Sequence, residues 1–149
     1  MELEARARSA GQVEGYRFGL ADTTTAVDPG PVIRQACADV LDGAAPELVA
    51  ARFQQGVVDM VLTVLRRLRD LTGLKYATLS GGVFLNSFLT AHCAGVLAAD
   101  GFESLQHRRV PASDAGIALG QVAVLAHVHQ SPRTTNGRPE PSEMEITCA

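Results

Sequence analysis

A long apolar stripe at helical spacing is the sequence feature that most constrains this chain. The stripe begins after Pro46-Glu47, a pair that favours a helix start, and ends at Thr72-Gly73, which supplies a C-terminal stop. Its apolar members are Leu48, Ala51, Phe53, Val57, Val58, Val61, Leu62, Leu65, Leu68 and Leu71. Arginines gather in the last turns, where they complement the negative end of the helix dipole. The pattern predicts one long helix over residues 46–72 with its stripe facing a core.

Short strands and helices alternate after this helix. Residues 75–79 suit a pleated surface and predict a strand that runs straight into Ser80-Gly81-Gly82. A helix is expected over about residues 86–99, a second strand over 102–107, and a last apolar helix that ends near His129. This order of strand, helix, strand, helix favours an α/β layered domain.

The N-terminal part has a weaker pattern. Asp28-Pro29-Gly30-Pro31 predicts a turn followed by a helix, which ends at Gly43. Before it, Tyr16, Phe18 and Leu20 alternate with polar or small residues in the manner of a short, half-buried strand. Residues 1–26 are otherwise unassigned.

Length and composition indicate one folded globular domain. The chain has 149 residues, of which 46% are hydrophobic and 19% are charged. A chain of this size and composition can bury a core. Residues 130–149 differ, because their proline-rich, polar composition predicts a disordered tail.

Charge and cysteine content exclude several classes of function. The formal net charge is -3 and the pI is near 5.8, so no basic field is available for general nucleic-acid binding. The three cysteines are widely spaced without a C-x-x-C pair, which favours a reducing compartment. The start lacks the apolar region of a secretory signal, and the apolar stretch 116–128 falls short of the roughly 20 residues that span a bilayer. We therefore expect a cytoplasmic protein with no membrane or nucleic-acid partner.

The first candidate site is Leu79-Ser-Gly-Gly-Val-Phe-Leu-Asn86, between the predicted strand and helix. Paired glycines let a backbone approach a phosphate without a Cβ in the way, and amides at the following helix N-terminus favour an anion. Asn86 can cap that helix or reach a ligand with its amide. A plain tight turn with an asparagine cap is the alternative, so the motif alone is a weak signal.

The second candidate site is the segment from Val110 to Gln121, with Asp114 at the mouth of the last helix. A carboxylate held there can coordinate a hard cation or act on a cation bound to phosphates. Ser113 or Asp114 could equally be only the N-cap of the helix. Gly116 and Gly120, four apart in an apolar helix, favour close helix packing over ligand contact.

The histidines give no metal site. His127 and His129 are two apart, which points them to different faces of a helix. His92 lies inside an apolar helix and is interpreted as a core histidine. His107 stands beside two arginines at a strand end, where it can face an anion or simply be solvated. No Gly-x-Ser-x-Gly elbow and no cysteine with a suitably placed histidine is present, so nucleophilic catalysis is not expected.

Taken together, three segments resemble the C-terminal signature of HypF-type carbamoyltransferases of hydrogenase maturation. They are residues 79–86, His-Arg-Arg-Val-Pro at 107–111 and Asp-Ala-Gly-Ile-Ala-Leu-Gly-Gln at 114–121. Asp28-Pro29 and Ala50-Ala-Arg-Phe53 also resemble that family, so the likeness covers roughly residues 27–128. The joint match is specific, whereas each motif alone is weak.

The resemblance implies the second lobe of an actin/Hsp70-like ATPase domain, a ribonuclease H-like, TsaD-related α/β fold in which a sheet is packed with helices. Two such lobes clasp a nucleotide and a metal between them. Residues 27–129 would form this lobe. The resemblance assigns nucleotide contacts to Ser80, Gly81, Gly82, Asn86 and Gly116. It assigns a divalent metal to Asp114.

The resemblance also implies a reaction and its partners. Such enzymes bind ATP and carbamoyl-adenylate and pass the carbamoyl group to the C-terminal cysteine of a HypE-type partner, on the route to the cyanide ligands of nickel-iron hydrogenase. The family's His-x-x-x-His metal motif belongs to the first lobe and has no counterpart here, and the acylphosphatase-like, zinc-binding and YrdC-like parts are missing. We therefore expect a fragment or split subunit that depends on a first-lobe polypeptide carrying the metal histidines.

Two positions depart from the family pattern. Ala115 replaces the first of two glycines after the aspartate, and Gln54 stands where histidine is common. Two other interpretations stay open: a non-catalytic nucleotide-binding or regulatory module, and a piece of a TsaD-like tRNA threonylcarbamoyltransferase. Val-Phe after Gly81-Gly82 and the Ala-Leu-Gly-Gln ending favour the HypF side.

Overall fold

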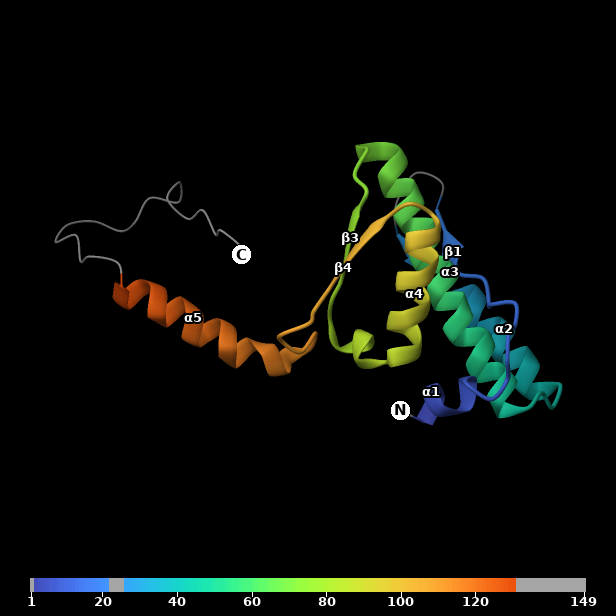
Figure 1. Ribbon diagram of the computed structural model, residues 1–149. Coiled ribbons are helices and arrows are strands. Elements are labelled where there is room, and N and C mark those ends of the chain that lie inside the picture. The colour runs from blue at the N-terminus through green and yellow to red at the C-terminus, as the bar shows by residue number, and fades with distance from the viewer. Residues whose placement is uncertain (1, 22–25, 131–149) are drawn as a thin grey trace. The chain divides into compact units, whose positions relative to one another are not determined.

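The computed structural model describes residues 2–21 and 26–130, in two compact units that divide after Gly116 (Figure 1). The predicted tail therefore lies outside the described residues from position 131 onward. The elements in chain order are α1 (Glu2–Ala7), β1 (Gly19–Leu20), β2 (Val27–Asp28), α2 (Gly30–Leu41), α3 (Pro46–Thr72), β3 (Tyr76–Leu79), the 3-10 helix η1 (Gly82–Leu85), α4 (Ser87–Ala99), β4 (Glu103–Gln106), the 3-10 helix η2 (Asp114–Gly116) and α5 (Ile117–Gln130). The second unit contributes α5, which confirms the predicted last helix.

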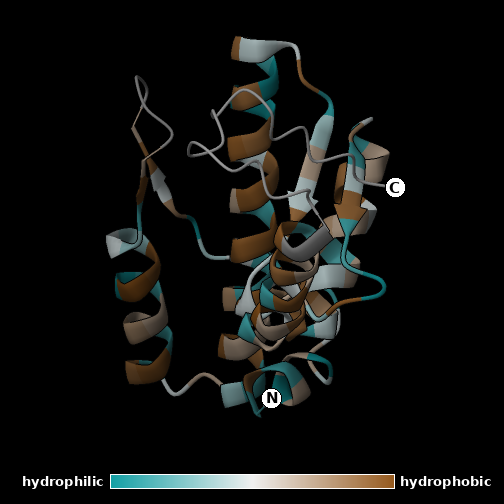
Figure 2. Cartoon of the chain, turned by 90° about the vertical axis from the view of Figure 1, so that its left-hand side faces the viewer, coloured by the Kyte–Doolittle hydropathy of each residue, from teal (hydrophilic) through white to brown (hydrophobic). Residues whose placement is uncertain are grey.

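The predicted long helix is α3, and it is the platform of the first unit. Gly73 ends it with a φ of 74°, and its N–H donates to the Arg69 carbonyl at 2.7 Å, as glycine stops do. Helices α1, α2 and α4 pack against α3, and hydrophobic residues recur along its length (Figure 2). By length and composition alone α3 could cross a bilayer, a test that the core helix of a globular protein passes as well.

The core of the first unit lies between α3, α4 and the sheet of β3 and β4. The two strands are parallel, and α4 connects them and lies beside both the sheet and α3 (Figure 1). Exposure alternates along β3, so that Ala77 and Leu79 face inward and their neighbours face out. The buried members of this cluster are Val58, Ala77, Leu79, Leu89, Cys93, Leu97 and Phe102. The predicted strand, helix, strand order is confirmed.

The N-terminal segment is held against α2 and α3 by a buried tyrosine. The Tyr16 hydroxyl donates to Asp39 Oδ2 at 2.6 Å, and Arg52 Nη1 binds the same oxygen at 2.6 Å. Burial, with the adjacent carboxylate, raises the pKa of Tyr16 to about 12. The strand predicted around residues 16–20 is shorter than expected, because only Gly19–Leu20 pairs, antiparallel, with β2.

Two glycines let this segment cross α3 in direct backbone contact. A Cβ on Gly56 would lie 2.3 Å from the Tyr16 carbonyl oxygen, and a Cβ on Gly15 would lie 2.4 Å from the Gly56 nitrogen. The close approach of the two backbones therefore explains why Gly56 stands inside a long helix, where a glycine otherwise lowers stability.

We predict opposite effects for two helical glycines. Gly56→Ala forces backbone apart and should lower the free energy of unfolding by about 1–3 kcal/mol. Gly95→Ala in α4 meets no atom within 4 Å and should raise it by about 0.5–1 kcal/mol, because alanine is the better helix former. Urea unfolding of both variants measures the difference, and equal stabilisation by both would contradict the close crossing.

The raised pKa of Tyr16 predicts a loss of stability in alkali. An unfolded tyrosine ionises near its ordinary pKa of 10.0, whereas folded Tyr16 holds its proton to about 12, so stability falls as pH rises between these values. Tyr16→Phe should reduce that slope to the part that the buried Cys93 thiol contributes, since burial raises its pKa to about 11, and Tyr76→Phe, at an exposed site, should leave the slope intact. Urea unfolding from pH 9 to 12 is the measurement; a slope unchanged in Tyr16→Phe would refute the burial argument.

Candidate functional site

The carboxyl ends of β3 and β4 form one edge, where both predicted loops begin. Leu79 is paired with Gln106, so the next residues, Ser80 and His107, leave the sheet side by side. Ser80 Oγ lies 2.9 Å from His107 Nε2, and both side chains are exposed. Ligands of parallel sheets bind outside the carboxyl ends of the strands, so this edge is the place to look for a site.

Gly81 joins the first loop to the second. Its φ of 98° and ψ of 163° fall in a region that only glycine adopts readily. Its N–H donates to the Ala112 carbonyl at 2.8 Å, so the two loops lie next to each other, as the sequence predicts. A Cβ on Gly81 or on Gly82 would meet no atom within 4 Å among the described residues, which leaves the backbone there open to a ligand.

In the second loop, one polar residue makes the capping bonds and the other is left exposed. The Gly116 N–H donates to the Ser113 carbonyl at 2.9 Å, and the Ala115 N–H donates to the Ser113 hydroxyl at 3.4 Å. Ser113 therefore caps η2, the 3-10 helix that precedes α5. Asp114 is exposed. Its carboxylate is thus left at the mouth of the loop for another partner.

Gly116 has a packing role, whatever else it does. A Cβ there would lie 2.9 Å from Val110 Cγ1 and 3.0 Å from the Pro111 carbonyl oxygen. A Cβ on Gly120 would meet nothing within 4 Å in the part of the chain that the structure describes, so close packing at that residue stays a prediction. The predicted nucleotide contact of Gly116 stays a prediction.

Both the oxygen and the nitrogen of the Asn86 side-chain amide form hydrogen bonds. Its Oδ1 accepts from the Leu89 N–H at 3.1 Å, which confirms the predicted helix cap. Its Nδ2 donates to Gln54 Oε1 at 3.2 Å, a contact that the sequence did not indicate. Capping and ligand contact are therefore compatible, because one Nδ2 hydrogen is still available.

The metal assignment rests on Asp114 alone. Among the residues that the structure describes, no group of three or more His, Cys, Asp or Glu side chains is placed to hold one ion. A divalent cation prefers several oxygen ligands, so a metal at Asp114 would need further ligands from outside this part of the chain, and the assignment stays a prediction. Asp114 fits such a cation by its chemistry and its exposure.

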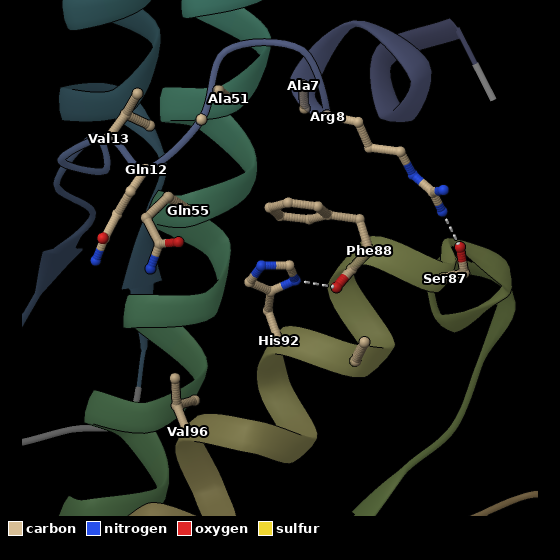
Figure 3. A pocket seen from close by; sticks show the side chains of 12 residues that line it. Ala7, Arg8, Gln12, Val13, Ala51, Gln55, Ser87, Phe88, His92 and Val96 are labelled. Atoms are coloured by element: carbon tan, nitrogen blue, oxygen red, sulfur yellow. Dashed lines mark hydrogen bonds between the residues drawn. The ribbon is translucent and has the colours of Figure 1, made fainter.

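His92 is not a core residue, and the core interpretation is wrong. It is exposed on α4, bonds the Phe88 carbonyl through Nδ1 at 2.8 Å and stacks on the Phe88 ring with centroids 3.8 Å apart. The pair lines a cavity of about 670 Å³ between α1, α3 and α4 (Figure 3). The uniformly apolar sequence of α4 gives no sign of which face is outward. None of the predicted site residues lines this cavity.

The contact of His107 with Ser80 was not predicted from the sequence. The signal that could have found it is register: in a parallel pair, the residues after two aligned strand ends become neighbours. Arg108 and Arg109 follow it and are also exposed, so they bring positive charge to the same end of β4.

The fold and the paired loops define one lobe of the actin/Hsp70-like class. The family model described as "Carbamoyltransferase, Kae1-like Domain, second subdomain" matches residues 1–121. The chain belongs to this HypF carbamoyltransferase family. The match takes in residues 1–26, which the motifs left unassigned, whereas the predicted domain boundaries themselves stay a prediction.

Relatives agree with this assignment. The chain is 32% identical over 126 residues to "Carbamoyltransferase HypF" of Rhodobacter capsulatus, which covers 85% of this chain and 16% of that protein. It is 29% identical over 105 residues to "Carbamoyltransferase HypF" of Synechocystis sp. (strain ATCC 27184 / PCC 6803 / Kazusa), covering 70% of this chain and 13% of that protein. The chain thus spans less than a fifth of the curated relatives that it matches.

Two solved HypF structures are also similar to this chain. A full-length HypF in the phosphate- and nucleotide-bound form matches with a TM-score of 0.75 and 30% identity, covering 87% of this chain and 17% of that chain. The T. kodakarensis HypF matches with a TM-score of 0.68 at 21% identity, over 87% of this chain and 16% of that chain, which supports the fold alone.

The unusual backbone of Gly81 gives a testable contrast within the loop. Gly81→Ala should lower the free energy of unfolding by about 1–3 kcal/mol, because alanine resists this φ and ψ. Gly82→Ala needs no such backbone and should change it by less than about 0.5 kcal/mol. Guanidinium unfolding of the two variants is the measurement, and similar losses in both would show that Gly81 does not set the loop.

Proposed function

We propose that this chain is the nucleotide-facing second lobe of a HypF-type carbamoyltransferase and that its paired loops bind ATP and carbamoyl-adenylate. The bond from the Gly81 N–H to the Ala112 carbonyl carries the proposal, because it holds the glycine loop and the Asp114 loop at one edge of the sheet. The solved HypF that resembles this chain is described as phosphate- and nucleotide-bound, which supports a nucleotide as the ligand.

The chemistry of the edge suits phosphate. Gly81 and Gly82 leave backbone open, and the exposed pair of Ser80 and His107 adds polar groups beside it. Two exposed arginines and His107 follow β4, so positive charge gathers at the carboxyl end of that strand. Amides and cations together favour an anionic ligand.

A divalent metal would be shared between lobes. Asp114 would hold it from this side, and the histidines of a first-lobe polypeptide would hold it from the other. When bound, such an ion neutralises phosphate charge. The chain's own part is to present one carboxylate, which the capping by Ser113 leaves unused.

The complete reaction belongs to the longer protein. We propose that the carbamoyl group goes to the C-terminal cysteine of a HypE-type partner, and that this chain acts in the cytoplasm without nucleic-acid or membrane partners. Because the chain spans 13–17% of the relatives compared above, the reaction requires segments that this chain does not contain. The family assignment favours this reaction over the TsaD-like alternative.

A non-catalytic nucleotide-binding module is the second candidate. The lone carboxylate at the loop favours it, since no three metal ligands gather within the described ranges. Binding without turnover in the presence of a first lobe would establish this candidate, whereas carbamoyl transfer under the same conditions would exclude it.

Calorimetry of the chain with ATP and Mg²⁺ tests the nucleotide site. Gly82→Asp places a negative charge in open space beside the phosphates and should weaken ATP binding at least about tenfold, or about 1.4 kcal/mol. Asp114→Ala should remove the dependence of binding on Mg²⁺.

Gly95→Asp is the matched control, because it adds the same charge at an open position on α4. It should bind ATP as the unmodified chain does. ATP binding that neither Gly82→Asp nor Asp114→Ala alters would refute the assignment.

A further inference from the structure

Gln54 is the one buried polar or charged side chain among the described residues, with 1% of its surface exposed. It lies in the middle of α3. Burying an amide lowers the stability of the fold unless its hydrogen bonds are made, so the partners of Gln54 indicate the role of this position.

The two bonds of Gln54 fix its orientation. Its Nε2 donates to the Leu3 carbonyl of α1 at 2.9 Å, and its Oε1 accepts from Asn86 Nδ2 at 3.2 Å. Reversing the amide would set donor against donor at Asn86 and oxygen against oxygen at Leu3. The network therefore admits one orientation only.

Gln54 and the helix cap together decide which group Asn86 can offer to a ligand. Asn86 Oδ1 is occupied by the Leu89 N–H of the helix cap, and one Nδ2 hydrogen is occupied by Gln54. The second Nδ2 hydrogen has no partner among the described residues. Asn86 is half-buried at the end of the glycine loop, so what it presents there is a donor rather than an acceptor.

We propose that Gln54 is a positioning residue of the nucleotide site: it locks the Asn86 amide so that an N–H faces the ligand. The ligand group opposite Asn86 is then an acceptor, such as a phosphate oxygen, a hydroxyl oxygen or a ring nitrogen. This inference rests on the proposed function. Gln54 itself is buried and does not touch the ligand.

Variants of Gln54 test the inference by calorimetry with ATP and Mg²⁺. Gln54→Leu removes one of the two bonds that hold the Asn86 amide in place and should weaken ATP binding about tenfold. Gln54→His keeps one donor and one acceptor in its neutral ring and should bind within about threefold of the unmodified chain. Gln55→Leu makes the same chemical change one residue along, where the amide bonds only Asp59 among the described partners, and should have no effect.

Side-chain amide NMR separates positioning from a loss of stability. The two Asn86 Nδ2 protons should give distinct, slowly exchanging signals, of which one shifts when ATP is added. In Gln54→Leu the Asn86 Nδ2 proton that had bonded Gln54 should exchange with water more rapidly, while Gln54→His should retain the slow exchange. If Gln54→Leu does not fold, the Gln54→His variant and the Asn86 signals of the unmodified chain decide the matter.

The outcomes distinguish the two proposals. ATP binding that is insensitive to Gly82→Asp overturns the proposed function and this inference with it. Binding that is sensitive to Gly82→Asp but unchanged in Gln54→Leu, with Asn86 signals that ATP does not move, overturns the role of Gln54 alone.

Discussion

The parallel pairing of β3 with β4 is the constraint on which the rest of the first unit depends. Because the strands run the same way and end together, with Leu79 opposite Gln106, the segments that follow them leave the sheet at one edge. A helix is the usual connection between parallel neighbours, and α4 takes that part. The bond between Gly81 and Ala112 extends the pairing past the strands. The spacing of the two loops is therefore set by backbone hydrogen bonds.

Three residues within little more than one turn of α3 hold different parts of this arrangement. Val58 is fully buried in the cluster under the sheet, Gly56 receives the N-terminal segment in backbone contact, and Gln54 bonds the residue that ends the glycine loop. The three residues lie within five positions of one helix, so they face different directions around the helix axis. A single rigid element thus fixes the sheet, the N-terminal segment and Asn86 relative to one another.

Sequence patterns predicted the elements well, because periodicity, proline starts and glycine stops are local. The α3 helix, its stop at Gly73 and the Asn86 cap all depend on residues within a few positions. The patterns failed where distant residues decide. The Ser80–His107 contact depends on strand register across 27 residues, and Gln54 meets a carbonyl 51 positions away. The exposure of His92 was missed for another reason, since an apolar helix has no polar face to mark its outside.

On the proposed function, this chain builds half of a nucleotide site, and its half is preorganised. The bonds that shape it, from Gly81 to Ala112, from Asn86 to Leu89 and from Gln54 to Asn86, all lie within the first unit. The loops therefore need no second lobe to take their shape. Under that proposal, a second lobe would add ligands to complete a metal site around Asp114 and a wall to exclude water. The proposal therefore lets the chain keep its family's fold and its loop geometry while turnover depends on another part of the longer protein.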